Sequence, residues 1–577
     1  MRIIPASILD HVASADEIIT RLLKLREITN INGYLNLPVP WDITLRDFGY
    51  SAASINRAIQ LVKAIRESGD PVVVYTDYDA DGITGGAILW ETLYKLGCKA
   101  VPYVPHRTAE GYGFSKAGID NAILQYKPRL FISVDHGIAA IDQVDYIRRL
   151  GIPVIITDHH QKQERVPDAD AIFHIPALSG AGVAYYFAKE LWQALDPDSA
   201  ALGALFRTDY LSFAAIGSIA DLVPLKGATR SLVKYGLGTF EGTTRVGLRQ
   251  MMMEAKIDGR QLHPHDIGFV IAPRINAVGR LGHALDALRL LCTTDIAKAE
   301  SLTRKLSEMN TDRKKLLDTA LEEAVSLVEK GSRESTIPEL TEAALPGSPE
   351  VAESRIPPLI ILRSDNWQEG IIGLIAARLC EQYFRPVIII TRSGNTLKAS
   401  CRSPATVDIT ALLSNWKQHF LSYGGHHQAA GFSLAMEQYP VFINAVARDI
   451  PTLISDNQLI RTYHADLQLP LGALSLELAE KLTALEPFGQ GNPRPAFSSQ
   501  GKVIEVKRIG GGSHLKMFVR DPEHSSVPVE IIAFKRGADY DVLADCPDIQ
   551  VLYSLETNTW NGKTSIQGKL LHWQPAR

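Results

Sequence analysis

Cysteine is scarce in this sequence. The 577 residues include only five cysteines, at positions 98, 292, 380, 401 and 546. Zinc ribbons and disulfide frameworks need closely spaced pairs, and no two of these residues form a CxxC motif, so the sequence predicts neither. Scattered free thiols are typical of a reducing compartment, and we therefore expect a cytoplasmic protein.

Long apolar runs and a strong net charge are also missing. No segment approaches the roughly 18 apolar residues that span a bilayer, and the N-terminal "MRIIPASILDHV" lacks the apolar core of a secretory signal. The formal net charge is -4 at pH 7, so a nucleic acid could bind only in a local basic groove. The remaining composition is that of an ordinary globular protein, long enough for three or four domains at about 150 residues each.

Short apolar runs alternate with helical patterns in residues 61–295. The runs at 71–75, 100–104, 130–134 and 153–157 predict strands, and amphipathic segments at 85–96 and 139–150 predict helices that follow two of them. This alternation is typical of a parallel sheet with crossover helices, so we expect an α/β catalytic domain here.

The rest of the chain divides into five more predicted segments that differ in composition and in the pattern of apolar residues. We expect an N-terminal helical extension at 1–60, a long connecting helix at 296–330, a flexible insert at 331–357, a second α/β domain at 358–455 and an OB-like β-barrel at 456–577. The insert is rich in Pro, Ser and Glu, whereas the last segment shows short strands at hairpin spacing. The barrel segment has no cluster of carboxylates and imidazoles, so we expect it to bind substrate without contributing chemistry.

Acidic residues follow the predicted strands of the first domain, and two histidines accompany them. The residues are Asp77, Asp79, Asp81, Asp135, Asp158, His159, His160 and Asp221. Ligands of open α/β sheets bind beyond the carboxyl ends of the strands, so these side chains should converge. A single Asp-Gly is more often a turn or a helix cap. Four clusters at one topological place, with no Lys or Arg beside them, instead predict divalent cations: Mn²⁺ for mixed carboxylate and imidazole ligands, Mg²⁺ for carboxylates and water.

Four short motifs then resemble those of the DHH phosphoesterase superfamily. They are "DYDADG" (77–82), "VDHG" (134–137), "TDHH" (157–160) and "ADLVPL" (220–225). The segments "HRTAEGYGFS" (106–115), "APRINAVGRLG" (272–282), "YGGHHQAAGFSL" (423–434) and "LEPFGQGNPRPAF" (485–497) extend the resemblance to the RecJ exonuclease family within it. The resemblance runs from about residue 60 to the C-terminus.

The resemblance implies a metal-dependent exonuclease that degrades single-stranded DNA 5′ to 3′ to mononucleotides in DNA repair and recombination. Two Mn²⁺ or Mg²⁺ ions would occupy each active site. The implied metal ligands are Asp77, Asp79, Asp81, Asp135, His159 and Asp221. Asp135 would bridge the two ions, and His160 would lie near the scissile phosphate. The implied partners are single-stranded DNA, a single-strand-binding protein and a helicase, with no membrane and a monomeric enzyme.

Further residues are candidates for substrate binding. They are Arg274, Asn276, Arg280, Arg402, Ser403, Gly424, Gly425, His426, Lys507, Arg508, Lys516 and Trp560. Glycines allow backbone N–H groups to approach a phosphate, basic side chains neutralise it, and exposed aromatic rings stack on bases. Helix caps, internal salt bridges and core packing are the alternatives for these residues. They apply equally to Phe518 and Tyr553, which are further candidates for stacking.

Two positions depart from the superfamily pattern and leave the division of ligands between the metals open. Tyr75 stands where many members have a metal-binding histidine, and His136 follows Asp135 where a small or uncharged residue is common. Two rival functions also remain. A phosphodiesterase of the same superfamily acting on short oligoribonucleotides or cyclic dinucleotides would have little need of the β-domain, and a non-catalytic replication scaffold would not need the metal ligands.

Overall fold

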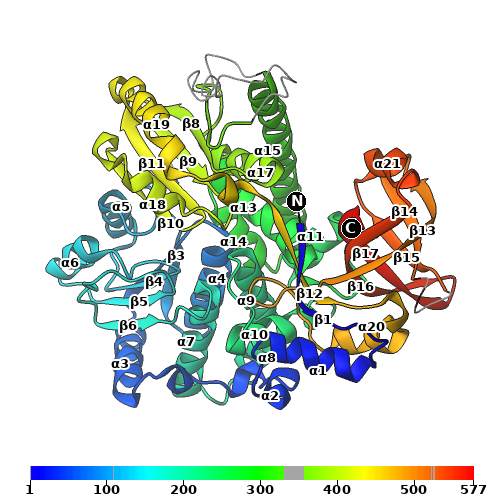
Figure 1. Ribbon diagram of the computed structural model, residues 1–577. Helices are drawn as coiled ribbons and strands as arrows, with labels where there is room; N and C mark the ends of the chain where they lie inside the picture. Colours follow the sequence, from blue (N-terminus) through cyan, green and yellow to red (C-terminus); the bar gives the residue numbers. More distant parts are fainter. Residues whose placement is uncertain (1, 108, 331–355, 522, 524–526, 577) are drawn as a thin grey trace. The chain divides into compact units, whose positions relative to one another are not determined.

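The computed structural model describes residues 2–107, 109–330, 356–521, 523 and 527–576 (Figure 1). The chain forms two compact units, Glu308–Thr462 and Arg2–Ser307 together with Tyr463–Arg577. Nearly all of the predicted insert, residues 331–355, lies outside the described residues. No helix in the described part of the chain is long and apolar enough to cross a membrane.

A five-stranded parallel sheet forms the centre of the first predicted domain. Its strands are β2 (Pro71–Thr76), β3 (Lys99–Tyr103), β4 (Leu130–Val134), β5 (Val154–Asp158) and β6 (Ala171–His174), in the order β3-β2-β4-β5-β6. The predicted parallel arrangement is confirmed. The sequence did not predict β6, because four residues are too few for a clear pattern. Since all the strands run the same way, their carboxyl ends lie at one edge.

Two largely buried helices pack against this sheet, and a third packs against both of them. They are α4 (Ala80–Lys95), α7 (Gly180–Leu195) and α9 (Asp209–Ala220). Helix α4 begins at Ala80, five residues before the predicted start, because Asp79 caps it and accepts the N–H groups of Asp81 and Gly82. The acidic cluster therefore lies at a helix N-terminus, whose positive dipole end stabilises negative charge.

Further helices lie between residues 2 and 307. They are α1 (Ala15–Leu25), α2 (Ile31–Leu35), α3 (Ala52–Ser68), α5 (Lys116–Tyr126), α6 (Ile141–Arg149), α8 (Ala200–Arg207), α10 (Gly227–Leu237), α11 (Val246–Glu254), α12 (Pro264–Asp266), α13 (Ala272–Leu281) and α14 (Leu285–Cys292). The predicted helix at 139–150 corresponds to α6.

The predicted connecting helix is present as α15 (Ile296–Lys330), which begins in one unit and continues into the other. Unit Glu308–Thr462 contains a five-stranded mixed sheet in the order β10-β11-β9-β8-β7. Its strands and helices are β7 (Ile360–Arg363), α17 (Ile372–Tyr383), β8 (Val387–Ser393), β9 (Thr396–Arg402), α18 (Ile409–Ser414), β10 (Ser422–His426), β11 (Ala429–Ala435) and α19 (Tyr439–Leu453). The second α/β domain is therefore confirmed as a fold element.

The C-terminal part forms a β-barrel with a helix and two more strands attached. Strands β13 (Phe497–Ile509), β14 (His514–Arg520), β15 (Val529–Ala533), β17 (Lys563–Pro575) and β16 (Asp548–Trp560) pair in this order. Because β16 also pairs with β13, the five strands close into a barrel, as expected of an OB-like domain. Short helix α21 (Tyr540–Ala544) lies between β15 and β16 in the sequence, and β12 (Thr462–Gln468) extends the sheet beyond β13.

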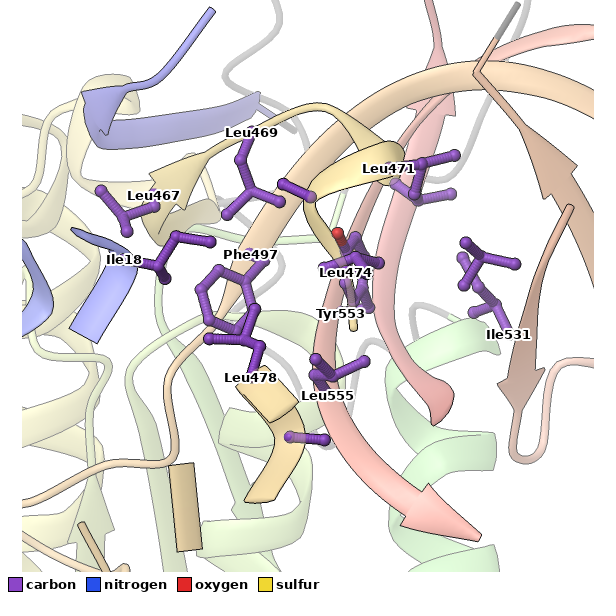
Figure 2. Packing of buried hydrophobic residues seen from close by; sticks show 14 of the residues in the cluster. Ile18, Leu467, Leu469, Leu471, Leu474, Leu478, Phe497, Ile531, Tyr553 and Leu555 are labelled. Carbon is purple, nitrogen blue, oxygen red and sulfur yellow. The ribbon is translucent and has the colours of Figure 1, made fainter. Parts of the chain in front are cut away.

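The first residues of the chain belong to this barrel domain. The sequence predicted a helical extension at 1–60 and no strand there. Strand β1 (Arg2–Ile8) joins the end of the same sheet beside β12. Helix α1 packs against α20 (Leu476–Thr483), and Ile18 of α1 lies in one hydrophobic cluster with Leu478 and Phe497 (Figure 2). Tyr553 is fully buried in this cluster, so its proposed stacking on bases is wrong.

Candidate metal centre and nucleic-acid-binding residues

The first acidic cluster lies where β2 meets α4. Asp77 is buried directly after the strand, and Asp79 uses its carboxylate as the helix cap. Asp81 is also buried. Its two oxygens accept the N–H groups of Gly180 and Ala181 at 2.6 and 2.9 Å. These bonds tie the start of α4 to the start of α7.

Asp135 lies at the end of the neighbouring strand β4. Its backbone is left-handed, with φ of 66°, a conformation that Asp adopts more readily than most residues. Gly180 lies so close that an added Cβ would be 2.4 Å from the Asp135 side chain. The turn and the close approach of α7 together fix the Asp135 carboxylate at the edge of the sheet.

The imidazole of His159 brings the separate acids together. Its Nε2 atom lies 3.1 Å from Asp135 Oδ1, 3.5 Å from Asp221 Oδ2 and 3.9 Å from Asp81 Oδ2. Ligand atoms close enough to share a cation form three groups: Asp77, Asp79 and Asp135; Asp81, His159 and Asp221; and Asp135, His159 and His160. The structure thus brings together every residue that the sequence predicted as a metal ligand.

Several buried polar atoms in this cluster have no hydrogen-bond partner. They are Asp77 Oδ1, Asp135 Oδ1 and His159 Nε2. The other ring nitrogen of His159 bonds the backbone of Leu178, which leaves the lone pair of Nε2 directed at the carboxylates. Buried polar atoms are almost always paired, so acceptors that face one another without donors fit a divalent cation as their common partner.

The electrostatics of the metal-free cluster agree with this interpretation. Burial and the neighbouring carboxylates raise the pKa of Asp77 and of Asp135 well above the usual value. The same causes raise the pKa of Asp81 to about 8 and that of Asp221 to about 7, and burial lowers the pKa of His159 to about 4. A bound divalent cation would reverse the shifts of the acids, because it favours their charged forms.

The second histidine of "TDHH" lies beside the cluster and is oriented by Asp158. His160 Nδ1 lies 2.8 Å from Asp158 Oδ1, which also accepts the backbone N–H groups of both histidines. Burial acts to lower the pKa of His160, but the hydrogen bond and charge of Asp158 raise it to about 9. The contact with Asp158 therefore favours the protonated form of His160, which lies beside the proposed metal ligands and is partly open to solvent.

Sequence reasoning gave no role to two residues that hold His160. Asp158 was noted as an acid at a strand end, but only the structure shows that it orients His160. The hydroxyl of Tyr112 lies 3.1 Å from His160 Nε2 and donates to the backbone oxygen of Asp135 at 3.2 Å. The sequence features that could have identified these two residues are the position of Asp158 within "TDHH" and that of Tyr112 within "HRTAEGYGFS".

Neither of the two departures from the superfamily pattern reaches the metal cluster. Tyr75 is fully buried and packs with Phe114 and Phe131 in a separate hydrophobic cluster. His136 Nε2 lies 3.0 Å from the backbone oxygen of Tyr75, and burial lowers the pKa of His136 to about 4. Both side chains therefore form part of the packing behind the site.

The candidates on α13 lie next to the metal cluster, but two of them make internal contacts. Asn276 Oδ1 accepts the N–H of Ala80 at 2.7 Å and so fixes the start of α4. Arg274 donates to the backbone oxygen of Val270 at 2.7 Å. Arg280 is half-buried, and its charge acts on the hydroxyl of Tyr78, next to Asp77 and Asp79. These contacts assign structural roles to Asn276 and Arg274 in the DNA-free protein.

The basic candidates of the barrel all have acidic partners. Lys507 pairs with Glu505 at 2.8 Å, Arg508 with Asp541 at 3.4 Å and Lys516 with Glu530 at 3.0 Å. Trp560 differs from them, because it lies at the tip of the β16–β17 hairpin with 74% of its surface exposed. Among the named barrel candidates, Trp560 has the free surface that base stacking requires.

The candidates in unit Glu308–Thr462 fall on two strands of its sheet. Gly424, Gly425 and His426 lie on the exposed edge strand β10. Arg402 ends β9 and donates to the backbone oxygen of Cys401 at 2.8 Å. Ser403 is buried, and its hydroxyl bonds the backbone oxygen of Val407 at 2.7 Å. Strand β10 is exposed, as a phosphate-binding site must be. The Ser403 hydroxyl already makes an internal hydrogen bond and is therefore not available to a phosphate.

Three family models match this chain. The DHH family, N-terminal domain, matches residues 71–217; the DHHA1 domain matches 357–450; and the RecJ OB domain matches 465–572. Together these stretches contain the metal cluster except Asp221, the edge strand β10 and nearly all of the β-barrel.

Curated proteins resemble the chain over most of its length. The single-stranded-DNA-specific exonuclease RecJ of Escherichia coli is 30% identical over 539 residues, which are 89% of this chain and 89% of that protein. The protein of the same name from Thermus thermophilus is 33% identical over 89% of this chain and 70% of its own length. The Bacillus subtilis relative is 29% identical, and the chain spans only 63% of its length.

A solved structure agrees with these sequence comparisons. The crystal structure of RecJ from Thermus thermophilus in complex with Mn²⁺ matches with a TM-score of 0.77 at 28% identity, covering 100% of this chain and 80% of that one. A second structure of the same protein, in complex with Mg²⁺, matches with a TM-score of 0.71.

Proposed function

The chain belongs to the RecJ family, and we propose that it is a metal-dependent exonuclease that degrades single-stranded DNA from the 5′ end to mononucleotides. The observation that carries the proposal is the cluster of buried acceptors around His159 Nε2 and Asp135 Oδ1, which have no hydrogen-bond partner. The relatives named as single-stranded-DNA-specific exonucleases supply the substrate class.

The residues present fit two divalent cations. Asp77, Asp79 and Asp135 would hold one ion, and His159 and Asp221 would hold the other; Asp135, whose Oδ1 lies 3.1 Å from His159 Nε2, would serve both. Asp81 is the weakest ligand candidate, because both of its oxygens already accept backbone N–H groups. Carboxylates with imidazole suit Mn²⁺, and Mg²⁺ is the alternative. Two such ions would supply Lewis-acid catalysis of phosphodiester hydrolysis.

The other residues of the site have roles that follow from their contacts. Asp158 favours the protonated form of His160 by raising its pKa, and in that form His160 would donate to a phosphate oxygen. Tyr112, which covers His160 Nε2, is 51% exposed and can move aside for a substrate. Asp158 fixes the orientation of His160 in the same way as a carboxylate orients a catalytic histidine in other hydrolases.

A strand of DNA needs binding groups beyond the metals. We assign base stacking to Trp560 and phosphate contacts to Lys507, Arg508 and Lys516, with a further phosphate site at the glycines and His426 of β10. Arg280 and Arg402 are proposed phosphate contacts nearer to the chemistry. The family resemblance further predicts a monomer, a cytoplasmic location, a role in DNA repair and recombination, and single-strand-binding protein and helicase partners. These stay predictions.

The proposal is tested by digesting end-labelled strands of DNA and RNA in Mn²⁺ or Mg²⁺. A 5′ label on DNA should appear in mononucleotides from the first time points, while a 3′ label should pass through progressively shorter strands. Chelation of the metal should stop both processes reversibly. Early release of the 3′ label would reverse the assigned direction, and faster digestion of RNA would contradict the assigned substrate.

A further inference from the structure

The loop at residues 485–493, between α20 and β13, is held rigidly by one buried side chain; we call it the support loop. Asn492 is 4% exposed and makes four hydrogen bonds. Its Nδ2 donates to the backbone oxygens of Leu485 and Pro487, each at 2.9 Å. Its Oδ1 accepts from Arg26 at 2.8 Å and from the Tyr34 hydroxyl at 2.9 Å. Every donor and acceptor of the amide is occupied, so the shape of the loop is fixed.

A buried arginine of the catalytic domain fastens the support loop in place. Arg230 of α10 is 1% exposed and donates to the backbone oxygens of Leu485 at 3.0 Å and Glu486 at 2.9 Å. Its guanidinium also lies 3.9 Å from the centre of the Tyr34 ring. Because a buried charge is stable only while its partners are in place, this contact holds the loop against α10.

The support loop packs against Pro224 and Leu225, which follow the proposed metal ligand Asp221 in the sequence. The N–H of Leu225 donates to the backbone oxygen of Gln490 at 2.7 Å. A Cβ added to Gly489 would lie 2.8 Å from Leu225 Cδ1, and one added to Gly491 would lie 2.8 Å from Pro224 Cβ. Only glycine allows so close an approach, and Gly491 also has a positive φ of 71°.

The Asp221 carboxylate is held by fewer bonds than that of Asp81. Asp81 accepts two backbone N–H groups, whereas among the described residues the Asp221 carboxylate makes no hydrogen bond, and its ion pair is with His159 Nε2 at 3.5 Å. Asp221 follows the last residue of α9, and Leu222 after it has a positive φ of 56°. The position of the carboxylate is therefore set by the backbone of residues 221–225, against which the support loop packs.

We propose that the support loop is a positioning element for Asp221, so that the β-barrel domain contributes to metal affinity as well as to DNA binding. The inference rests on the proposed metal centre. It revises the expectation that the segment after Pro470 has no part in the chemistry. Contacts that orient metal ligands commonly change metal affinity by about 10–100-fold when they are lost.

The test is the affinity of the DNA-free protein for Mn²⁺, measured from the loss of the free-ion signal in electron paramagnetic resonance. Gly491→Ala should raise the dissociation constant of one of two bound ions by about tenfold or more. Gly511→Ala is the matched control. It places the same methyl group at a φ of 65° in the same domain, with no atom within 4 Å, and should bind Mn²⁺ as the wild type does. DNA hydrolysis by Gly491→Ala should recover towards the wild-type rate as Mn²⁺ is raised.

Circular dichroism shows whether Gly491→Ala is folded. If it is not, Gly489→Ala replaces it, because its methyl group meets only the side chain of Leu225. A smaller loss of affinity, by about threefold to tenfold, is then expected. A folded variant with wild-type affinity for both ions overturns the role of the support loop. If the wild type itself binds no Mn²⁺, the proposed metal centre fails, and the inference fails with it.

Discussion

Asp135 is the residue on which the proposed chemistry depends most. It is buried, belongs to two of the three groups that could hold a cation, and lies 3.1 Å from His159 Nε2. Asn has almost the same shape and also tolerates a positive φ, so Asp135→Asn should remove the charge without disturbing the turn. We expect hydrolysis to fall by at least about 100-fold, as when a preorganised electrostatic partner is lost.

Initial rates and circular dichroism of Asp135→Asn would check this prediction. Asp142→Asn, an exposed change on α6 of the same domain, is the control and should keep the wild-type rate. A folded Asp135→Asn protein with nearly wild-type activity would show that the chemistry takes place elsewhere.

Asp158 should affect turnover more than it affects metal binding. Its carboxylate bonds His160 Nδ1 but belongs to none of the groups that could hold a cation. Asp158→Asn would leave His160 less firmly oriented and less often protonated, since Asp158 raises its pKa. We expect the turnover rate to fall by about 10–100-fold, with Mn²⁺ affinity changed less than about threefold. A large loss of Mn²⁺ affinity would instead make Asp158 part of the metal centre.

The acids of the cluster also predict how pH acts on the metal-free protein. Burial and mutual repulsion raise the pKa of Asp81 to about 8 and of Asp221 to about 7 in the folded state. Their protonated forms therefore favour folding, and this stability is lost as pH rises through the folded pKa values. We expect the melting temperature to fall between about pH 6 and about pH 8 without metal, and the increase caused by Mn²⁺ to be larger at the higher pH.

Thermal melts of the wild type and of Asp221→Asn, with and without Mn²⁺, would measure this effect. The substitution removes one of the titrating groups, so the metal-free melting temperature should depend less steeply on pH. A metal-free melting temperature that rises over the same interval would contradict the assigned direction.

Among the structural elements, the strands of the first sheet were the easiest to predict. Strands β2, β4 and β5 are continuous apolar runs buried on both faces, and an acid marks the carboxyl end of each. Helix α4 was predicted to begin at residue 85, because three aspartates suggest a loop. In the structure Asp79 is its cap and Asp81 bonds the distant Gly180 and Ala181. A contact between residues a hundred positions apart leaves no local pattern.

Contacts between distant residues also explain why the acidic partners of the basic barrel candidates were not predicted. Arg508 and Lys516 are evident as charges in the sequence, but their acidic partners Asp541 and Glu530 come from other elements. The metal-ligand candidates could be predicted from the sequence, because each lies close after a predicted strand or at the end of an apolar segment. The support loop could not have been predicted, since its role follows from packing against Pro224 and Leu225.

The β16–β17 hairpin offers a prediction about DNA binding. Trp560 is exposed at its tip, and stacking on a base contributes roughly 1–3 kcal/mol. Trp560→Ala should therefore weaken the binding of single-stranded DNA by about fivefold to 100-fold, with the turnover rate at saturating DNA nearly unchanged. Fluorescence anisotropy of a labelled strand measures the affinity.

Tyr94→Ala is a suitable control for Trp560→Ala. Tyr94 is 63% exposed, near the end of α4 opposite to the metal ligands, so the change should leave DNA affinity unaltered. Equal affinities for the wild type and Trp560→Ala would remove the hairpin from the proposed DNA path.

For the molecule as a whole, the central claim is that the site acts on long single strands. The chain combines a metal centre with a closed β-barrel, and a barrel has little use in an enzyme for dinucleotides. A groove that follows several phosphates binds longer strands more tightly, and its affinity falls with salt. A pocket for a short product gains nothing from additional nucleotides.

The most direct test is the catalytic efficiency, kcat/KM, on single-stranded DNA from two to about thirty nucleotides, at fixed Mn²⁺ and low salt. A polynucleotide exonuclease should show an efficiency that rises with length over several nucleotides and levels off when the binding path is filled, with a smaller rise at higher salt. An efficiency that is greatest at two or three nucleotides would contradict the account and favour a small-substrate phosphodiesterase of the same superfamily.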